Sequence, residues 1–136
     1  MLLLVQCYGC LPCSVTYSQW LLDTSSEEQG RVLATLVRSI DARRILDLGT
    51  FTGYSSIAMA LAAADDAKVT CCEPQRRYAN DARDWWAKAG VSAKMQMHEK
   101  DAVELLKEIP IGSEFSVEVT SPKLAMDAGL APRGAQ

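Results

Sequence analysis

The sequence predicts an α/β fold in which a parallel sheet is flanked by helices. The apolar run 45–48 ends at Gly49, and a second glycine, Gly53, precedes a stretch rich in strong helix formers. Two further short apolar segments, 68–73 and 94–98, are each followed by a segment with helical periodicity. Strands that alternate with helices form parallel sheets with right-handed crossovers. With 136 residues, 49% of them hydrophobic, the chain forms one domain at most and has ample material for a core.

The first helix is expected over residues 25–40. Ser25 and Glu28 have the spacing of a capping box, and Ser26 with Gln29 offers a second register. One buried face is expected from the apolar residues at helical spacing. These are Val32, Leu33, Leu36, Val37 and Ile40. Residues 1–24 carry a single charge and differ in composition from the rest, so they form an atypical N-terminal segment without a predicted structure.

The stretch 45–55, with the sequence ILDLGTFTGYS, carries most of the functional information. A strand, a glycine turn and a helix bring backbone N–H groups and a helix N-terminus to a ligand beyond the strand's carboxyl end. A dinucleotide site has the pattern G-x-G-x-x-G, but Phe51 stands in place of the second glycine and leaves little room for a pyrophosphate. Asp47 would attract a cation, such as the ammonium and sulfonium groups of S-adenosylmethionine. Alternatively, Asp47 is only a polar strand end and the glycines only form a turn.

The second predicted strand, 68–73, ends in an acid, Glu73. At this position a carboxylate can accept both hydroxyls of a ribose. The alternative is a solvent-facing carboxylate at a strand end. The helix expected over 75–89 has an apolar face, on which Trp85 and Trp86 are both assigned to packing.

The third predicted strand, 94–98, leads into another helix. Asp101 with Glu104 has the spacing of an N-terminal cap.

Residues 47–55 resemble motif I of the cation-dependent O-methyltransferases, the group that includes caffeoyl-CoA and catechol O-methyltransferases. The sequence FTGYS is highly specific for this motif. Upstream, 25–30 resembles the family's opening segment S-x-[DE]-E-G-Q, with its last two residues in swapped order. Downstream, Glu73 matches the family's acidic strand end, and Asp101-Ala102 matches its D-A pair. The resemblance covers roughly residues 24 to 109.

The resemblance implies the Rossmann-like fold of S-adenosylmethionine-dependent methyltransferases, with 25–115 as its cofactor-binding half. The residues that it assigns to the cofactor are Ser25, Asp47, Gly49, Thr50, Ser55, Glu73 and Ala102. Ala102 would offer its N–H to the adenine. For Ser25 and Asp101, a plain N-cap is an equally good interpretation. In the family, Mg²⁺ held by carboxylates acts as a Lewis acid on a catechol-like acceptor.

The family pattern breaks after Phe115. The expected aspartate-bearing strand and the motif D-A-D-K are missing, and no strand leads into Asp127, which is therefore given no metal role. Residues 116–136 are predicted to be a divergent, irregular tail, as in a truncated isoform. The three predicted strands would then leave the inner edge of the sheet unpaired. Catalytic residues and Mg²⁺ ligands are not identified in this sequence.

Three functions from different classes follow. The first is an S-adenosylmethionine-dependent O-methyltransferase acting on a small hydroxylated acceptor and catalytically incomplete in this chain. The second is a non-catalytic cofactor-binding or interaction module, as a homodimer or paired with a full-length copy. The third is a nicotinamide-dependent oxidoreductase, which Phe51 in the glycine turn disfavours.

Composition narrows the partners and the compartment. The formal charge of −3 gives no basic footprint for nucleic acid, and no apolar run approaches a membrane span. Cys7, Cys10 and Cys13 have a spacing suited to a metal or an iron–sulfur cluster, but a fourth ligand is missing, so no metal site is assigned. Five cysteines cannot all pair, which favours a reducing compartment such as the cytoplasm.

Overall fold

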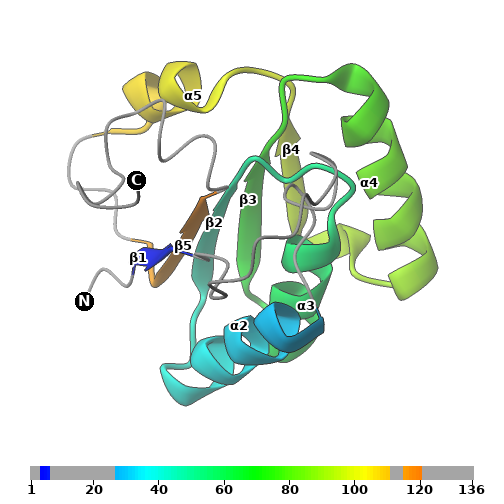
Figure 1. Ribbon diagram of the computed structural model, residues 1–136. Coiled ribbons are helices and arrows are strands. Elements are labelled where there is room, and N and C mark those ends of the chain that lie inside the picture. Colours follow the sequence, from blue (N-terminus) through cyan, green and yellow to red (C-terminus); the bar gives the residue numbers. More distant parts are fainter. Residues whose placement is uncertain (1–3, 7–26, 111–114, 121–136) are drawn as a thin grey trace, which may run out of the picture.

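The computed structural model describes residues 4–6, 27–110 and 115–120, which form a five-stranded parallel sheet with helices on both faces (Figure 1). The sheet order is β1-β5-β2-β3-β4. The strands are β1 (Leu4–Gln6), β2 (Arg44–Leu48), β3 (Lys68–Cys72), β4 (Met95–His98) and β5 (Val117–Thr120). The helices are α2 (Glu27–Ser39), α3 (Tyr54–Ala62), α4 (Arg76–Ala89), the short 3₁₀ turn η1 (Ser92–Lys94) and α5 (Ala102–Glu108). The predicted α/β class with a parallel sheet is confirmed. None of these helices has the length and apolar character needed to cross a bilayer.

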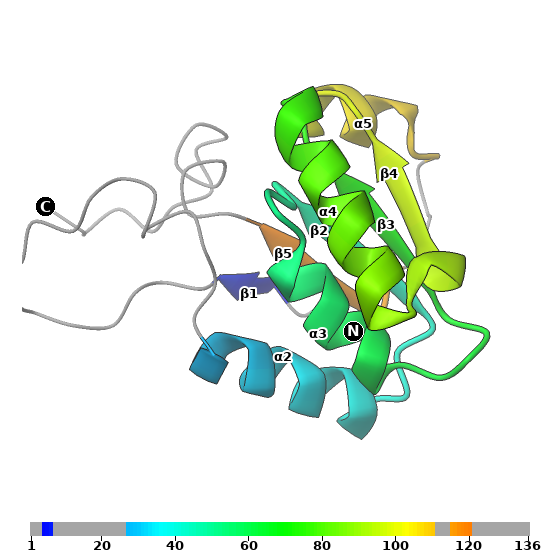
Figure 2. The same ribbon diagram turned by 90° about the vertical axis from the view of Figure 1, so that its right-hand side faces the viewer.

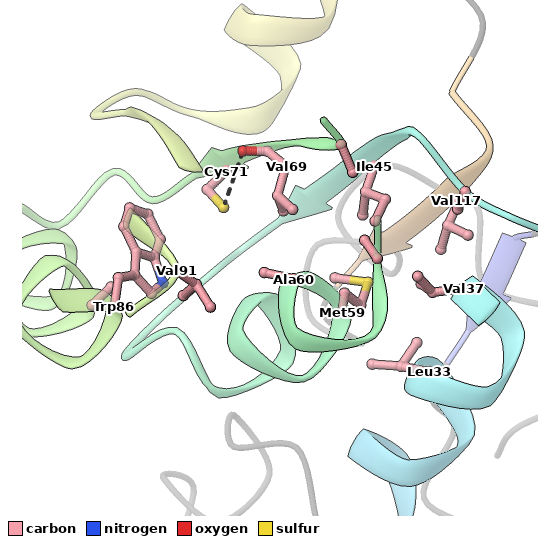
Figure 3. Close-up of a cluster of buried hydrophobic side chains, with 14 residues drawn as sticks. Leu33, Val37, Ile45, Met59, Ala60, Val69, Cys71, Trp86, Val91 and Val117 are labelled. Atoms are coloured by element: carbon pink, nitrogen blue, oxygen red, sulfur yellow. Dashed lines mark hydrogen bonds between the residues drawn. The ribbon is translucent and has the colours of Figure 1, made fainter. Parts of the chain in front are cut away.

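Two apolar cores lie on opposite faces of the sheet. Successive side chains of β2 alternate between them, because a strand has a period of two. Ile45 packs into the larger core with α2, α3 and α4, and this core includes Met59 and Trp86 (Figure 3). Leu46 and Leu48 pack into the smaller core against α5. The view in Figure 2 shows α4 and α5 on the two sides of the sheet. Asp47, between Leu46 and Leu48, therefore points to the side of α3.

The buried face of α2 is narrower than predicted. Leu33 and Val37 are fully buried, whereas Val32 is 53% exposed and Ile40 is also exposed. The helix approaches α3 closely at Gly30, where an added Cβ would lie 2.9 Å from a ring carbon of Tyr54, and it ends at Ser39, before Ile40. The assignment of Val32 and Ile40 to this buried face is wrong. Ser25 and Ser26 lie outside the described residues, as does the capping box they would form.

The two tryptophans of α4 have different environments. Trp86 is buried, but Trp85 is 52% exposed, with Nζ of Lys88 4.2 Å from its ring centroid. Neighbouring residues of a helix point about 100° apart, and in α4 the buried face contains Trp86 together with Ala79 and Ala82 but not Trp85. The prediction that both tryptophans serve packing is therefore right for Trp86 and wrong for Trp85.

The sheet continues beyond the three predicted strands. Val117–Thr120 form β5, which pairs in parallel with β2, with Ile45 opposite Val117. On its other side β5 pairs with the N-terminal strand Leu4–Gln6. The irregular tail predicted from residue 116 is thus wrong for 117–120, and the inner edge of β2 is paired. The rest of that tail lies outside the described residues.

Candidate functional site

The loop between β2 and α3 is a tight turn with an uncommon backbone. Three residues have positive φ: Gly49 at 82°, Phe51 at 53° and Gly53 at 89°. Glycine adopts such angles without a steric penalty, whereas phenylalanine does not. The sequence predicted the turn from its two glycines, and the structure adds a third left-handed residue between them. We call residues 49–53 the glycine turn.

The backbone N–H groups of the glycine turn are mostly used within the protein. Those of Gly49 and Thr50 both donate to the carbonyl oxygen of Cys72, at 2.9 and 3.0 Å. That of Gly53 donates to the carbonyl oxygen of Thr50, and that of Phe51 to the side chain of Glu73. The turn is therefore hydrogen-bonded to the end of β3, and its N–H groups at these four positions are not free to bind a ligand. This differs from the expectation that its N–H groups face a ligand.

Asp47 is a buried carboxylate beside the N-terminus of α3. It is 1% exposed, and the hydroxyl of Ser55 donates to both of its oxygens, at 3.2 and 3.1 Å. Burial raises the pKa of Asp47 to about 6; the hydroxyls of Ser55 and Thr50 oppose this shift, and the charge of Glu73 adds to it. A cation placed nearby would favour the ionised form. The predicted site residues Asp47 and Ser55 are thus in direct contact.

Glu73 is buried at the end of β3 and bound to the glycine turn. Its Oε2 accepts the N–H of Phe51 at 3.0 Å, and its Oε1 accepts the N–H of Gln75 at 2.9 Å. The side chain is not solvent-facing, because the residue is only 5% exposed. A carboxylate has about four acceptor positions, so these two bonds leave capacity for further donors.

Thr50 has a position inside the protein, between two strands. Its hydroxyl donates to the carbonyl oxygen of Asp47 at 3.1 Å and accepts the N–H of Cys72 at 3.2 Å. One bond ties the turn to β2 and the other ties it to the end of β3. The structure therefore gives the Thr50 hydroxyl a role in shaping the turn.

Trp86 and Ser56 form a hydrogen-bonded pair that holds the carbonyl group of Gly53. Sequence reasoning did not assign either residue to the site. Nε1 of Trp86 donates to Oγ of Ser56 at 3.0 Å, and this hydroxyl donates to the carbonyl oxygen of Gly53 at 2.8 Å. A Cβ on Gly53 would lie 2.8 Å from Nε1 of Trp86. The serine after the FTGYS motif was the only local signal for this network.

On the other side of the turn, the ring of Phe51 packs against Tyr78 of α4. Their centroids are 4.3 Å apart, with the planes tilted by 58°. Sequence reasoning used Phe51 only to exclude a pyrophosphate. The two rings instead form a contact between the glycine turn and α4.

The third strand end carries the predicted cap. Oδ1 of Asp101 accepts the N–H of Val103 at 2.8 Å, which confirms Asp101 as the N-cap of α5. Ala102 is buried in the smaller core with Leu46 and Leu48. Because β2, β3 and β4 are parallel neighbours, Asp47, Glu73 and Ala102 all lie at the same edge of the sheet. Ser25 lies outside the described residues.

The part of the chain that the structure describes offers no cluster of three or more His, Cys, Asp or Glu side chains suited to a metal ion. Cys71 and Cys72 are buried free thiols, and burial raises the pKa of both. Cys7, Cys10 and Cys13 lie outside the described residues. The described residues thus do not fit a Mg²⁺ site.

A groove of about 600 Å³ runs between α2 and α3. Its lining includes Gly30, Ala34, Tyr54 and Leu61. Asp47, Gly49, Thr50, Ser55, Glu73 and Ala102 are not among the residues that line it. The groove is therefore separate from the sheet edge at which the predicted site residues gather.

Comparisons with known proteins point to one family. A family model described as O-methyltransferase matches residues 14–119. The catechol O-methyltransferase domain-containing protein 1 of Mus musculus is 39% identical over 87 residues, which are 64% of this chain and 33% of that protein. Tricin synthase 1 of Oryza sativa subsp. japonica is 36% identical over 91 residues, 67% of this chain and 36% of that protein.

Solved structures agree with these relatives. The O-methyltransferase TomG from Streptomyces achromogenes, in complex with SAM, has 34% identity and a TM-score of 0.70, and the match covers 79% of this chain and 49% of that one. An O-methyltransferase from Bacillus cereus in complex with SAH has 26% identity and a TM-score of 0.71, and the match covers 79% and 50%. The chain thus spans about a third of the length of the curated relatives and about half of these structures.

Proposed function

This chain belongs to the O-methyltransferase family, and we propose that it binds S-adenosylmethionine at the carboxyl edge of β2, β3 and β4. The whole protein would then transfer the methyl group to a hydroxyl oxygen of a small acceptor. The observation that carries the proposal is the buried Asp47 carboxylate, fixed by Ser55 next to the glycine turn. A buried carboxylate is stabilised by a cationic ligand.

The methionine end of the cofactor fits the glycine turn and α3. Its ammonium and sulfonium groups are attracted by the charge of Asp47. Its carboxylate suits the positive end of the helix dipole of α3, which starts at Tyr54. A pyrophosphate fits less well, because the N–H groups of Gly49, Thr50, Phe51 and Gly53 are already used and Asp47 would repel it. This favours S-adenosylmethionine over a nicotinamide dinucleotide.

The ribose and adenine would lie toward β3 and β4. Glu73 keeps acceptor capacity after its two backbone bonds, and a carboxylate with two free acceptor positions suits the vicinal hydroxyls of a ribose. Ala102, at the start of α5, borders the proposed adenine position. The contributions of Gly49, Thr50 and Ser55 are structural in part, since they shape the turn and fix Asp47.

When bound, the cofactor would supply a methyl group on a positively charged sulfur. The acceptor oxygen, having lost its proton, would bond to the methyl carbon in line as the carbon–sulfur bond breaks, and S-adenosylhomocysteine would leave. We propose that this 136-residue chain alone binds the cofactor without efficient transfer. In support, the described residues do not fit Mg²⁺, and the family's D-A-D-K motif is not found in the sequence. The alternative is a non-catalytic module that pairs with a second or full-length copy. The free thiols of Cys71 and Cys72 support a reducing, cytoplasmic compartment.

A labelled-methyl assay tests the catalytic part of this proposal. The purified chain would be incubated with S-adenosylmethionine labelled in its methyl group, catechol and Mg²⁺, and product would be counted with and without EDTA. Cofactor binding with no labelled product is the expected result. Mg²⁺-dependent product above a no-enzyme control would instead show that this chain is a complete enzyme. A parallel titration with NAD is expected to give no binding.

A further inference from the structure

We propose that Glu73 is a positioning residue that holds the glycine turn through Phe51, and thereby couples the ribose end of the cofactor site to its methionine end. This inference rests on the proposed function for its effect on cofactor affinity. Its structural part concerns the ligand-free protein and can be tested without a cofactor. The carboxylate would thus serve two partners at once, the ligand and the turn.

Phe51 is the strained residue of the turn. Its φ of 53° lies in the left-handed region, where the Cβ of a non-glycine residue comes too close to the following carbonyl oxygen. Something must therefore stabilise this conformation. Two contacts of Phe51 do so. Its N–H donates to Oε2 of Glu73 at 3.0 Å, and its ring packs on the ring of Tyr78, with 4.3 Å between the two ring centroids. The first is a bond to a carboxylate, which is stronger than a bond between neutral groups.

Glu73 is itself firmly placed. Its backbone N–H donates to the carbonyl oxygen of His98 at 3.1 Å, and its Oε1 accepts the N–H of Gln75 at 2.9 Å. The backbone of Glu73 is therefore fixed to β4 and its carboxylate to the start of α4, so the carboxylate is a fixed acceptor for the N–H of Phe51. Loss of the carboxylate should release the turn and leave the strands in place.

The position of Phe51 explains why a change in its backbone conformation would alter the part of the site that binds the methionine group of the cofactor. Phe51 lies between Gly49 and Gly53, and Gly53 leads directly into α3, which carries Ser55 and so fixes Asp47. A turn that relaxes at residue 51 moves the start of α3 relative to Asp47. A plain ribose acceptor at position 73 would have no such effect.

The binding test compares two ligands in calorimetric titrations. S-adenosylhomocysteine contains both ends of the cofactor, whereas adenosine contains only the ribose and the base. Glu73→Ala is expected to weaken the first ligand about tenfold more than the second, since only the first needs the turn. Equal losses for both ligands would overturn the coupling. Glu73→Gln, which keeps acceptor oxygen, is expected to lie between the wild type and Glu73→Ala.

A matched pair of variants at position 51 separates the turn from the ring contact. Phe51→Asn and Phe51→Leu both remove the aromatic ring that contacts Tyr78, but asparagine tolerates the left-handed region and leucine does not. In the Glu73→Ala background, Phe51→Asn should bind S-adenosylhomocysteine about threefold to tenfold more tightly than Phe51→Leu. Identical affinities of the two double variants would contradict the proposal.

Hydrogen exchange of the Phe51 amide separates this inference from the proposed function. In the ligand-free protein, Glu73→Ala should speed exchange at this amide by about tenfold or more, whereas the amides of β3 that precede Cys72 should be unchanged, because the Cys72 amide itself donates to Thr50 of the turn. If the wild type fails to bind S-adenosylhomocysteine, the proposed function fails, but this measurement still decides whether Glu73 holds the turn. Unchanged exchange at Phe51, in a variant that melts cooperatively, would refute the positioning role.

Discussion

The hydroxyl of Ser55 donates to both carboxylate oxygens of Asp47, at 3.2 and 3.1 Å, and so joins the start of α3 to the end of β2. Asp47 is buried at this point, and the Ser55 hydroxyl is one of the two groups that lower its pKa against the effect of burial. Ionised Asp47 is the form that a cationic ligand needs. The pair therefore links the local fold directly to the proposed chemistry.

Ser55→Ala tests this pair. The variant should raise the pKa of Asp47 further, because it removes a hydrogen bond that favours the charged form. Affinity for S-adenosylmethionine at pH 7 should fall by about tenfold, the effect of one hydrogen bond to a charged group. Calorimetric titrations over pH 5.5 to 8 would measure both effects. Ser55→Thr is the control, since it keeps the hydroxyl; a loss as large as that of Ser55→Ala would point to sterics.

The raised pKa of Asp47 gives a specific dependence of stability on pH. The folded pKa of about 6 exceeds the ordinary value of 3.8, so the folded state binds more protons between these values. The contribution of Asp47 to the free energy of unfolding is therefore present at pH 4 and declines as the pH rises through 6, by about 3 kcal/mol in total. Asp47→Asn should remove this decline.

Urea unfolding of the wild type and of Asp47→Asn at pH 4.5 and pH 7.5 would measure about 2 kcal/mol of that decline, because the rest already occurs below pH 4.5. The variant should gain stability relative to the wild type at the higher pH and lose affinity for the cofactor. Carboxylates that do not interact with Asp47 affect both proteins alike, so only the difference between the two proteins, which includes the repulsion between Asp47 and Glu73, is interpreted. A constant difference across this pH range would show that Asp47 has an ordinary pKa.

Gly53→Ala is expected to destabilise the protein more than Gly90→Ala. Gly53 has a φ of 89°, and an added Cβ would lie 2.8 Å from Nε1 of Trp86. Gly90 makes a matched control, because its φ is also positive, at 71°, but a Cβ there would meet nothing within 4 Å. We expect a loss of about 1 kcal/mol for Gly90→Ala and of at least about 2 to 3 kcal/mol for Gly53→Ala. Equal losses would mean that the Trp86 contact has no effect.

The local parts of the fold could be predicted from the sequence. Apolar runs, glycines and the Asp101 cap are local signals, and they placed β2, β3, β4, the glycine turn and α5. Strand β5 was missed because the family pattern breaks there. Its residues Val-Glu-Val-Thr still show β-branched residues in alternation, which was the available strand signal.

The contacts that complete the site could not be predicted in the same way. The bond from the N–H of Phe51 to Glu73 depends on a left-handed phenylalanine, which no periodicity reveals. The bond from Trp86 to Ser56 joins residues 30 positions apart and depends on how α4 packs on α3. Sequence patterns identified the acids at the strand ends, whereas tertiary packing determined what each acid binds.

Val117→Asp tests whether β5 belongs to the core. Val117 is fully buried in the larger apolar core and pairs with Ile45 of β2. An unpaired carboxylate there should destabilise the fold by more than about 3 kcal/mol and abolish cooperative melting. Val32→Asp is the control, since Val32 is 53% exposed, and it should change stability by less than about 0.5 kcal/mol. A Val117→Asp protein with normal melting would return this segment to the irregular tail predicted from the sequence.

The most direct measurement is a calorimetric titration of the purified chain with S-adenosylmethionine, with an Asp47→Asn, Glu73→Gln double variant alongside. We predict saturable binding by the wild type and a loss of at least about a hundredfold in the double variant, with cooperative melting retained by both. Absence of binding by a wild-type chain that melts cooperatively would refute the proposed cofactor site. So would undiminished binding by the double variant, because the cofactor would then lie elsewhere than at Asp47 and Glu73.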